Sequence, residues 1–136
     1  MADTTVTLRW AGDGLRFEGG GEGGPVVSID GNGVAGPRPT ELLLLGLGGC
    51  MGADIVDILG KMRVPLEALE IRLEGDRAAE PPRRFLRIRL YCDVWGLSEE
   101  DEPKLERAVA LSREKYCSVL HTLRPDCEIG IETRRR

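Results

Sequence analysis

A long apolar stretch in the first half of the chain is the feature that most constrains the fold. It opens with Leu42-Leu43-Leu44-Leu45 and continues to about residue 62, with glycines at positions 46, 48, 49 and 52. Because its first half is apolar on nearly all sides, it predicts a helix that is central and buried. Thr40 is the expected N-cap of this helix, and the negative charge of Glu41 lies near the positive helix end.

The four glycines lower the intrinsic stability of this helix by up to ~1 kcal/mol each relative to alanine. A helix that tolerates them is expected to have a close neighbour along its backbone, which could be another helix, a ligand or the same helix of a second subunit. The run from Leu42 to Ala53 has 12 residues before Asp54 and Asp57, whereas a membrane span needs roughly 20. We therefore expect a buried helix and no association with a membrane.

The flanking segments predict strands and a second helical region. Alternation with a period of two predicts strands over 4–11, 15–18, 25–30, 67–76 and 85–95, and a final strand is expected over 127–132. A second helix is expected from about Asp101 to Cys117, with one or two further turns to Leu123. The glycine-rich segment 19–24 is expected to be a flexible loop. The order βββ-α-ββ-α(α)-β predicts a single α+β domain over residues 1–136.

The composition argues against nucleic acid as a partner and favours oligomers. The net charge is −4, whereas a nucleic-acid-binding protein is expected to present a basic face. The one basic cluster, Arg134-Arg135-Arg136, is expected to be a solvated tail. Aromatic residues make up only 4% of the chain, so the core must be built mainly from small aliphatic side chains. Modest cores favour pairing of subunits, which covers surface that a monomer would expose.

The cysteines at positions 50, 92, 117 and 127 limit the range of redox chemistry. Their spacing is not that of a secreted disulfide framework, and the segment 1–5 lacks the basic start and apolar run of a signal peptide. We therefore expect a cytoplasmic protein with reduced thiols. One histidine and four scattered cysteines offer no close set of zinc ligands. The absence of a Cys-x-x-Cys motif argues against a thioredoxin-type exchanger.

Cys50 and Cys117 each lie in a segment that is predicted to be helical. If the two thiols meet, they form a dithiol that can be oxidised and reduced in a cycle; otherwise each is a small buried hydrophobic residue. The reactive species is the thiolate, and a free cysteine with a pKa of about 8.5 is only slightly ionised at neutral pH. A cation is therefore expected beside the nucleophile, and arginine is the natural choice. Cys92 is expected to belong to the core, and Cys127, at the start of a strand, to the core or to the edge of the sheet.

Three other polar residues lie near these cysteines in the sequence. Asp54 and Asp57 follow Cys50 on about the same helical face. A carboxylate that close would oppose a thiolate unless a cation neutralised it, so we expect both to pair with arginines. His121 lies four residues after Cys117 and could assist a thiolate, but a lone histidine at such a position is more often a surface or capping residue.

The two cysteine segments together resemble those of the OsmC/Ohr family of thiol-dependent hydroperoxide reductases. The first segment is Pro39-Thr40-Glu41-Leu42-Leu43-Leu44 through Gly49-Cys50, followed by Asp54-Ile55-Val56; the second is Arg107-Ala108-Val109 through Glu114-Lys115-Tyr116-Cys117-Ser118-Val119. The expected order of elements is also similar, so that the resemblance covers most of the chain. The Gly-Gly-Cys form and the chain length are closer to the OsmC-like branches than to Ohr itself.

This resemblance implies a tightly intertwined homodimer with two active sites near the subunit interface. It implies that Cys50 is the peroxidatic thiol and Cys117 the resolving thiol, and that the two form a disulfide during the cycle. The substrates would be organic hydroperoxides, in defence against oxidative or osmotic stress. An external dithiol would be the reductant, and no metal or bound organic cofactor would be needed.

The chain also departs from the family pattern. Members use an arginine from the N-terminal strands, for which Arg9 and Arg16 are the candidates and Arg38 is a third. They carry a glutamate ten residues before the first cysteine, where this chain has Thr40, and helical geometry turns Glu41 about 100° away from that position. This difference keeps an alternative function open: a non-enzymatic dimeric module that binds a small ligand or senses oxidant in the same pocket without turnover.

Overall fold

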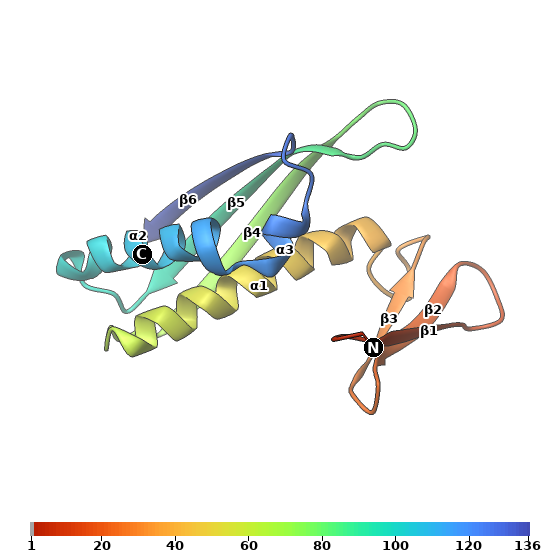
Figure 1. The fold of residues 1–136 in the computed structure, drawn as a ribbon, viewed down its shortest axis with the longest axis horizontal. Helices are drawn as coiled ribbons and strands as arrows, with labels where there is room; N and C mark the ends of the chain where they lie inside the picture. Colours follow the sequence, from red (N-terminus) through yellow and green to blue (C-terminus); the bar gives the residue numbers. More distant parts are fainter. Residues whose placement is uncertain (1) are drawn as a thin grey trace. The chain divides into compact units, whose positions relative to one another are not determined.

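The computed structural model describes residues 2–136 and divides into two compact units. The first unit ends at Leu43 and the second spans Leu44–Arg136. The elements follow one another as three strands, a long helix, two strands, a helical region and a last strand (Figure 1). This order is the predicted α+β arrangement, βββ-α-ββ-α(α)-β.

The first unit is a three-stranded antiparallel sheet. Its strands are β1 (Val6–Trp10), β2 (Arg16–Gly21) and β3 (Val26–Asp30), in the order β1-β2-β3. The segment 19–21 was predicted to be part of a loop, but it completes β2 and pairs with both neighbouring strands. A Cβ atom at Gly19 or Gly20 would run into the backbone carbonyl of a neighbouring segment, so these glycines permit close strand pairing instead of flexibility.

The turn after β3 is organised by a buried carboxylate. Asp30 is 2% exposed, and its side chain accepts hydrogen bonds from the backbone N–H groups of Asn32, Val34 and Ala35, at 2.8, 3.3 and 2.9 Å. These bonds hold the pKa of Asp30 below its usual range, because they stabilise the ionised form.

The long helix α1 spans Pro39–Lys61. It begins one residue earlier than predicted, so Thr40 lies in its first turn and is not its N-cap. Proline is favoured at such a start because the first N–H groups of a helix have no intrahelical partner. The carboxylate of Glu41 accepts a hydrogen bond from the backbone N–H of Arg38 at 3.0 Å, which satisfies another donor at this end.

The second unit consists of helices packed on one face of a three-stranded sheet. The sheet contains β4 (Ala68–Arg77), β5 (Phe85–Trp95) and β6 (Glu128–Arg135); β5 is central, antiparallel to β4 and parallel to β6. Alternate residues of β5 point into the core, which is completed by α1 and by α2 (Glu102–Leu111). The central members of this core are Leu47, Met51, Ile55, Leu59, Ile88, Leu90, Cys92, Val94, Leu105, Ala108 and Val109.

Helix α1 is buried on one side only, whereas the sequence predicted burial nearly all round. Leu45 and Val56 are 57% and 51% exposed, although Leu47, Met51 and Ile55 are fully buried. By length and composition α1 could also span a membrane, so the count of 12 residues understated its apolar length. Core helices meet the same criteria, and six residues of this one are buried in the fold.

The outer face of the same sheet carries charged side chains. Arg89 and Arg87 of β5 bind Asp76 of β4, and Arg87 also binds Glu128 of β6. The basic end of the chain is paired in and next to β6 instead of forming a free tail; Arg134 and Arg136 bind Asp93 on this face, whereas Arg135 binds Glu102 of α2.

Candidate functional site

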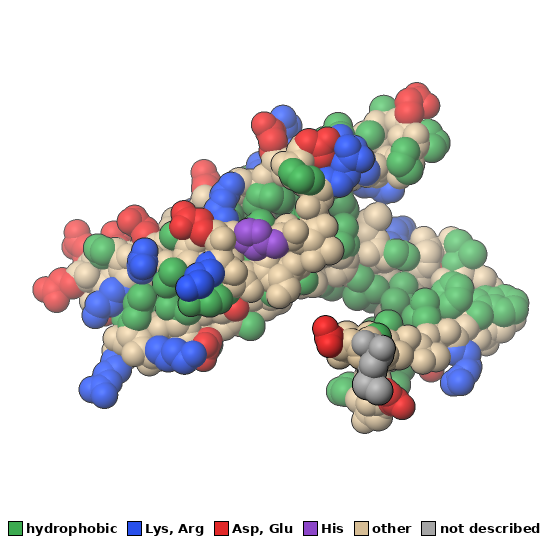
Figure 2. All heavy atoms as spheres, viewed as in Figure 1, with side chains coloured by type: hydrophobic (Ala, Val, Ile, Leu, Met, Phe, Trp, Pro, Cys, Tyr) green, Lys and Arg blue, Asp and Glu red, His purple; other side chains and the backbone are tan. Residues whose placement is uncertain are grey.

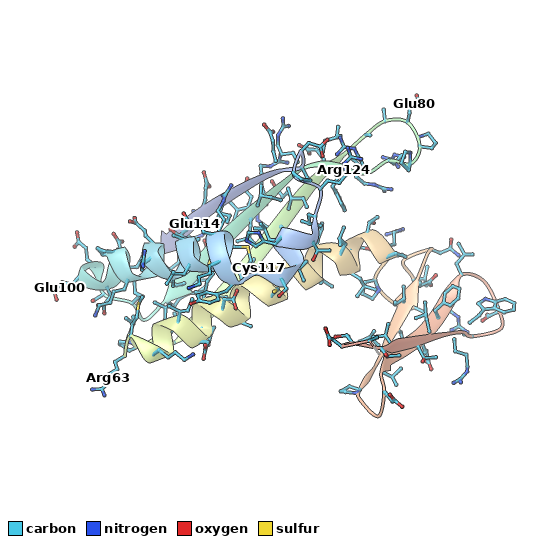
Figure 3. All side chains as sticks on the ribbon, in the orientation of Figure 1. Arg63, Glu80, Glu100, Glu114, Cys117 and Arg124 are labelled. Carbon is cyan, nitrogen blue, oxygen red and sulfur yellow. The ribbon has the colours of Figure 1, made fainter. Side chains whose placement is uncertain are left out.

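The two cysteines singled out by the sequence lie side by side in the second unit. Cys50 is half-buried in the middle of α1, and Cys117 is fully buried between two helical segments (Figure 3). Both are free thiols. The thiol of Cys50 is close enough to raise the pKa of Cys117, so the fold assembles a dithiol from segments that are 67 residues apart.

Cys117 is held by a break in the second helical region, where the sequence predicted a continuous helix. Helix α2 widens into a π-helical turn, η2 (Ser112–Tyr116), and Cys117 then adopts an extended backbone with φ −73° and ψ 99°. The short helix α3 (Ser118–Thr122) starts directly after it, with Cys117 as its N-cap. Its Sγ accepts a hydrogen bond from the backbone N–H of Leu120 at 3.4 Å. A π-turn at a helix end is frequent at functional sites.

Burial raises the pKa of Cys117 to about 11. The Leu120 N–H opposes this shift, whereas the Cys50 thiol and the charge of Asp54 add to it. Cys117 is therefore a neutral thiol at neutral pH, because its anion would be poorly solvated and would face a carboxylate. Any thiolate that starts a reaction here is expected on the partly exposed Cys50.

The two aspartates after Cys50 were predicted to pair with arginines, but in residues 2–136 they have other partners. Asp54 accepts a hydrogen bond from the buried hydroxyl of Ser112 at 2.8 Å, and Asp57 forms an exposed ion pair with Lys61 at 2.9 Å. The sequence pointed to Asp54 only through its spacing from Cys50. It carried no signal for Ser112, whose partner is 58 residues away in the chain.

The candidate arginines all belong to the first unit. Arg9 lies exposed on β1. Arg16 binds Asp13 at the hairpin turn, at 2.6 Å. Arg38 donates to the carbonyl oxygen of Asn32 at 3.0 Å and pairs with Glu41 at 3.6 Å. Since Cys50 belongs to the second unit, the activation of its thiol by Arg9 or Arg16 stays a prediction.

The histidine and the other two cysteines have contacts typical of structural residues. His121 Nε2 donates to the carbonyl oxygen of Arg113 at 2.9 Å, in agreement with a capping role. Cys92 and Cys127 are buried in the core as expected, and burial raises the pKa of Cys92 to about 11. Among residues 2–136, no group of three or more histidine, cysteine or carboxylate side chains could hold a metal ion.

An apolar groove runs along the exposed side of α1, next to β4. Its volume is about 710 Å³. Leu69, Ile71 and Leu73 of β4 form one wall. The helical wall is formed by Leu45, Gly48, Gly49, Gly52, Ala53, Val56 and Asp57. Side chains of β4 lie close to Gly48 and Gly52, whereas a Cβ atom at Gly46 or Gly49 would meet nothing within 4 Å. The fold therefore explains two of the four glycines, at positions 46, 48, 49 and 52, that the sequence singled out.

Comparisons with known proteins agree on one family. Residues 30–132 match the family model described as OsmC-like protein. Protein YhfA of Escherichia coli K12 is 41% identical over 113 residues, which cover 82% of this chain and 83% of that protein. A crystal structure of a hypothetical protein from Aquifex aeolicus is similar with a TM-score of 0.83 and 32% identity, covering 100% of this chain and 99% of the other.

A further solved structure has the same fold at lower identity. It is an organic hydroperoxide resistance protein OsmC from Legionella pneumophila, with a TM-score of 0.69 and 18% identity, covering 98% of each chain. The α+β fold is thus shared across proteins whose sequences have diverged widely.

Proposed function

This chain belongs to the OsmC-like family, and we propose that it is a thiol peroxidase that reduces organic hydroperoxides. The observation that carries the proposal is the pair of free thiols, Cys50 and Cys117, brought together within one unit of the fold. A family relative of the same fold is named an organic hydroperoxide resistance protein. A role in oxidative or osmotic stress defence in the reducing cytoplasm follows from this proposal.

The different burial of the two thiols supports the order in which they react in this proposal. Cys50 is the more exposed thiol and attacks the O–O bond as the thiolate, which releases the alcohol and leaves a sulfenic acid on Cys50. The buried thiol of Cys117 then attacks the Cys50 sulfur, and the S–O bond breaks. A Cys50–Cys117 disulfide forms, and the hydroxyl group leaves with the Cys117 proton as water. An external dithiol reopens the disulfide by two exchange steps and is itself oxidised to a disulfide.

The surroundings of the site favour an organic substrate. Cys50 packs against the hydrophobic core of the second unit, so its thiol is bordered by apolar side chains. An alkyl hydroperoxide would gain free energy by placing its apolar part against such a surface, which hydrogen peroxide could not do.

The homodimer belongs to the proposal as well. Apolar side chains of the first unit lie open to solvent, among them Val6, Leu8 and Trp10 at 68%, 53% and 56% exposure. The space-filling view shows hydrophobic side chains gathered on this unit (Figure 2). Apolar patches of this kind mark interaction sites, and a second copy of the chain is the partner that the family resemblance implies. Within that dimer, Arg9 or Arg16 would supply the cation for the Cys50 thiolate.

Intact-mass measurement after one equivalent of an organic hydroperoxide tests the chemistry. Formation of the disulfide removes two hydrogens, so the mass of the reduced protein should fall by about 2 Da. Cys50→Ser and Cys117→Ser should abolish this loss. Cys92→Ala and Cys127→Ala are the matched controls and should retain it, because those thiols lie in the core. Unchanged thiols in the wild-type protein under excess peroxide would contradict the proposal.

A sensor or ligand-binding module without turnover is the second candidate. Thr40, in the first turn of α1, stands where the family resemblance leads one to expect a glutamate, and this difference favours a slower or incomplete cycle. Steady consumption of hydroperoxide with a dithiol reductant would identify an enzyme. A single oxidation without further turnover would identify a sensor.

A further inference from the structure

Ser112 connects the two cysteine segments through both its side chain and its backbone. The residue is fully buried. Its hydroxyl donates a hydrogen bond to Asp54 Oδ2 at 2.8 Å. Its carbonyl oxygen accepts a hydrogen bond from the backbone N–H of Cys117, also at 2.8 Å. One residue of the π-turn therefore contacts α1 on one side and the buried cysteine on the other.

Asp54 lies on the same face of α1 as Cys50, because the two residues are four positions apart. Ser112 binds Asp54 through its hydroxyl and Cys117 through its backbone. These two hydrogen bonds link the helical turn that carries Cys50 to the segment that carries Cys117. Bond formation requires the two Cα atoms to approach within about 7 Å. The Ser112–Asp54 bond is a side-chain hydrogen bond that joins η2 to α1 beside the two thiols.

The carboxylate also acts on Cys117 through its charge. Burial is the main cause of the raised pKa of this thiol, and the charge of Asp54 adds a smaller contribution beside that of the Cys50 thiol. Its raised pKa disfavours Cys117 as the first nucleophile, and its proton must leave with the hydroxyl group when it attacks the oxidised Cys50. The charge of Asp54 and its hydrogen bond with Ser112 thus both act on Cys117.

We propose that Asp54 and Ser112 are a positioning pair for the resolving thiol, which hold Cys117 against Cys50. The catalytic role rests on the proposed peroxidase function, whereas the positioning of the two thiols does not. Asp54 and Ser112 act in the second step of the cycle, in which the Cys117 sulfur attacks the Cys50 sulfenic acid. A slower attack would leave the sulfenic acid open to further oxidation to the sulfinic acid by a second hydroperoxide.

Three variants separate the charge of Asp54 from its hydrogen bond. Asp54→Asn removes the charge and keeps an oxygen that can accept from Ser112. Asp54→Ala and Ser112→Ala remove the bond. Asp57→Asn is the matched control, because this carboxylate lies on α1 and binds only the exposed Lys61 in the described contacts. Thermal unfolding of each variant establishes that it is folded before thiols are measured.

The first measurement is a pH titration of the Cys117 thiol by NMR of labelled cysteine Cβ atoms, in a Cys50→Ser background. Asp54→Asn should lower the pKa of Cys117, and Asp57→Asn should leave it unchanged. The second is the rate at which diamide oxidises the reduced protein to the Cys50–Cys117 disulfide. Both Asp54 variants lack the charge, so their ratio isolates the hydrogen bond. Asp54→Ala should be roughly 10-fold to 100-fold slower than Asp54→Asn, as expected for misplaced reacting atoms.

Neither measurement uses peroxide, so the result stands apart from the peroxidase test. An unchanged titration of Cys117 in Asp54→Asn would overturn the charge role. Equal diamide rates for Asp54→Ala and Asp54→Asn, with Ser112→Ala as fast as wild type, would overturn the positioning role. If wild type instead forms no sulfenic acid with hydroperoxide while both thiol measurements follow expectation, the peroxidase proposal fails and the pair remains.

Discussion

At the scale of single residues, identical side chains acquire different properties from their burial. Cys50 and Cys117 have the same chemistry in an unfolded chain, but Cys117 is fully enclosed and its pKa is raised to about 11 by burial. Glycines differ in the same way. Gly19 and Gly20 permit the close approach of neighbouring strands, whereas the space around Gly49 is open.

Gly20→Ala should destabilise the first unit by about 1–3 kcal/mol, as overpacking does in general. The added Cβ would meet the backbone carbonyl of Pro25, and backbone cannot move aside as a flexible side chain can. Gly24→Ala is the control, because its Cβ would make only ordinary contacts of 3.5 Å or more and its backbone lies outside the left-handed region. Chemical denaturation measures both. Equal stability of the two variants would contradict this account of β2.

At the scale of elements, the sheet of the second unit has two faces with different physical roles. One face buries alternate residues of β5 against α1 and α2. The other face is a network of arginines and carboxylates that connects all three strands, with Arg89 and Arg87 near its centre. Hydrogen bonds from Arg89, opposed by partial burial, hold the pKa of Asp76 below its usual range.

The network should make stability depend on pH in the acid range. Because the pKa of Asp76 is lower in the folded protein than in the unfolded chain, its contribution is present above the unfolded pKa of about 3.9. That contribution is lost as the pH falls toward the folded value. Arg89→Gln should therefore unfold at a higher pH than wild type in an acid titration followed by circular dichroism. Lys104→Gln, which removes a longer ion pair with Asp101, serves as the control. Coincident acid transitions would contradict this role of the network.

At the scale of the whole molecule, apolar surface stays exposed in both units. The first unit exposes side chains of β1 and β3, and the second exposes one side of α1, where Leu45 and Val56 line the groove. A Cβ atom at Gly46, Gly49 or Gly60 of α1 would meet nothing within 4 Å in the described chain. These features agree with the proposed homodimer, in which a second copy covers the apolar surface.

Leu45→Glu should weaken the proposed dimer by roughly 100-fold, because burial of an unpaired charge costs several kcal/mol. Leu86→Glu is the control, since Leu86 is 42% exposed and lies outside the groove. Sedimentation velocity over a range of concentrations measures the monomer–dimer equilibrium. A wild-type protein that is monomeric at all concentrations, or a Leu45→Glu variant that dimerises as tightly as wild type, would contradict an interface at this groove.

The sequence by itself determined the order of the elements and the identity of the two thiols. Strand alternation and the apolar run are local patterns with periods of two and about 3.6 residues, so they can be read without knowledge of distant segments. The boundaries were less accurate. The predicted start of α1 missed Pro39, the glycines of β2 were taken for a loop, and the helix break before Cys117 was missed. The pairing of the β2 glycines depends on neighbouring strands, whereas a proline start is a local preference that the sequence already contained.

Only the tertiary structure decided how the candidate site is assembled. Asp54 was expected to bind an arginine, but folding brings it to Ser112, and this partner then contacts Cys117. The different burial of Cys50 and Cys117 likewise results from packing around them. The physical reason is that hydrogen-bond partners and solvation depend on which distant residues meet in space. The sequence around each residue does not contain that information.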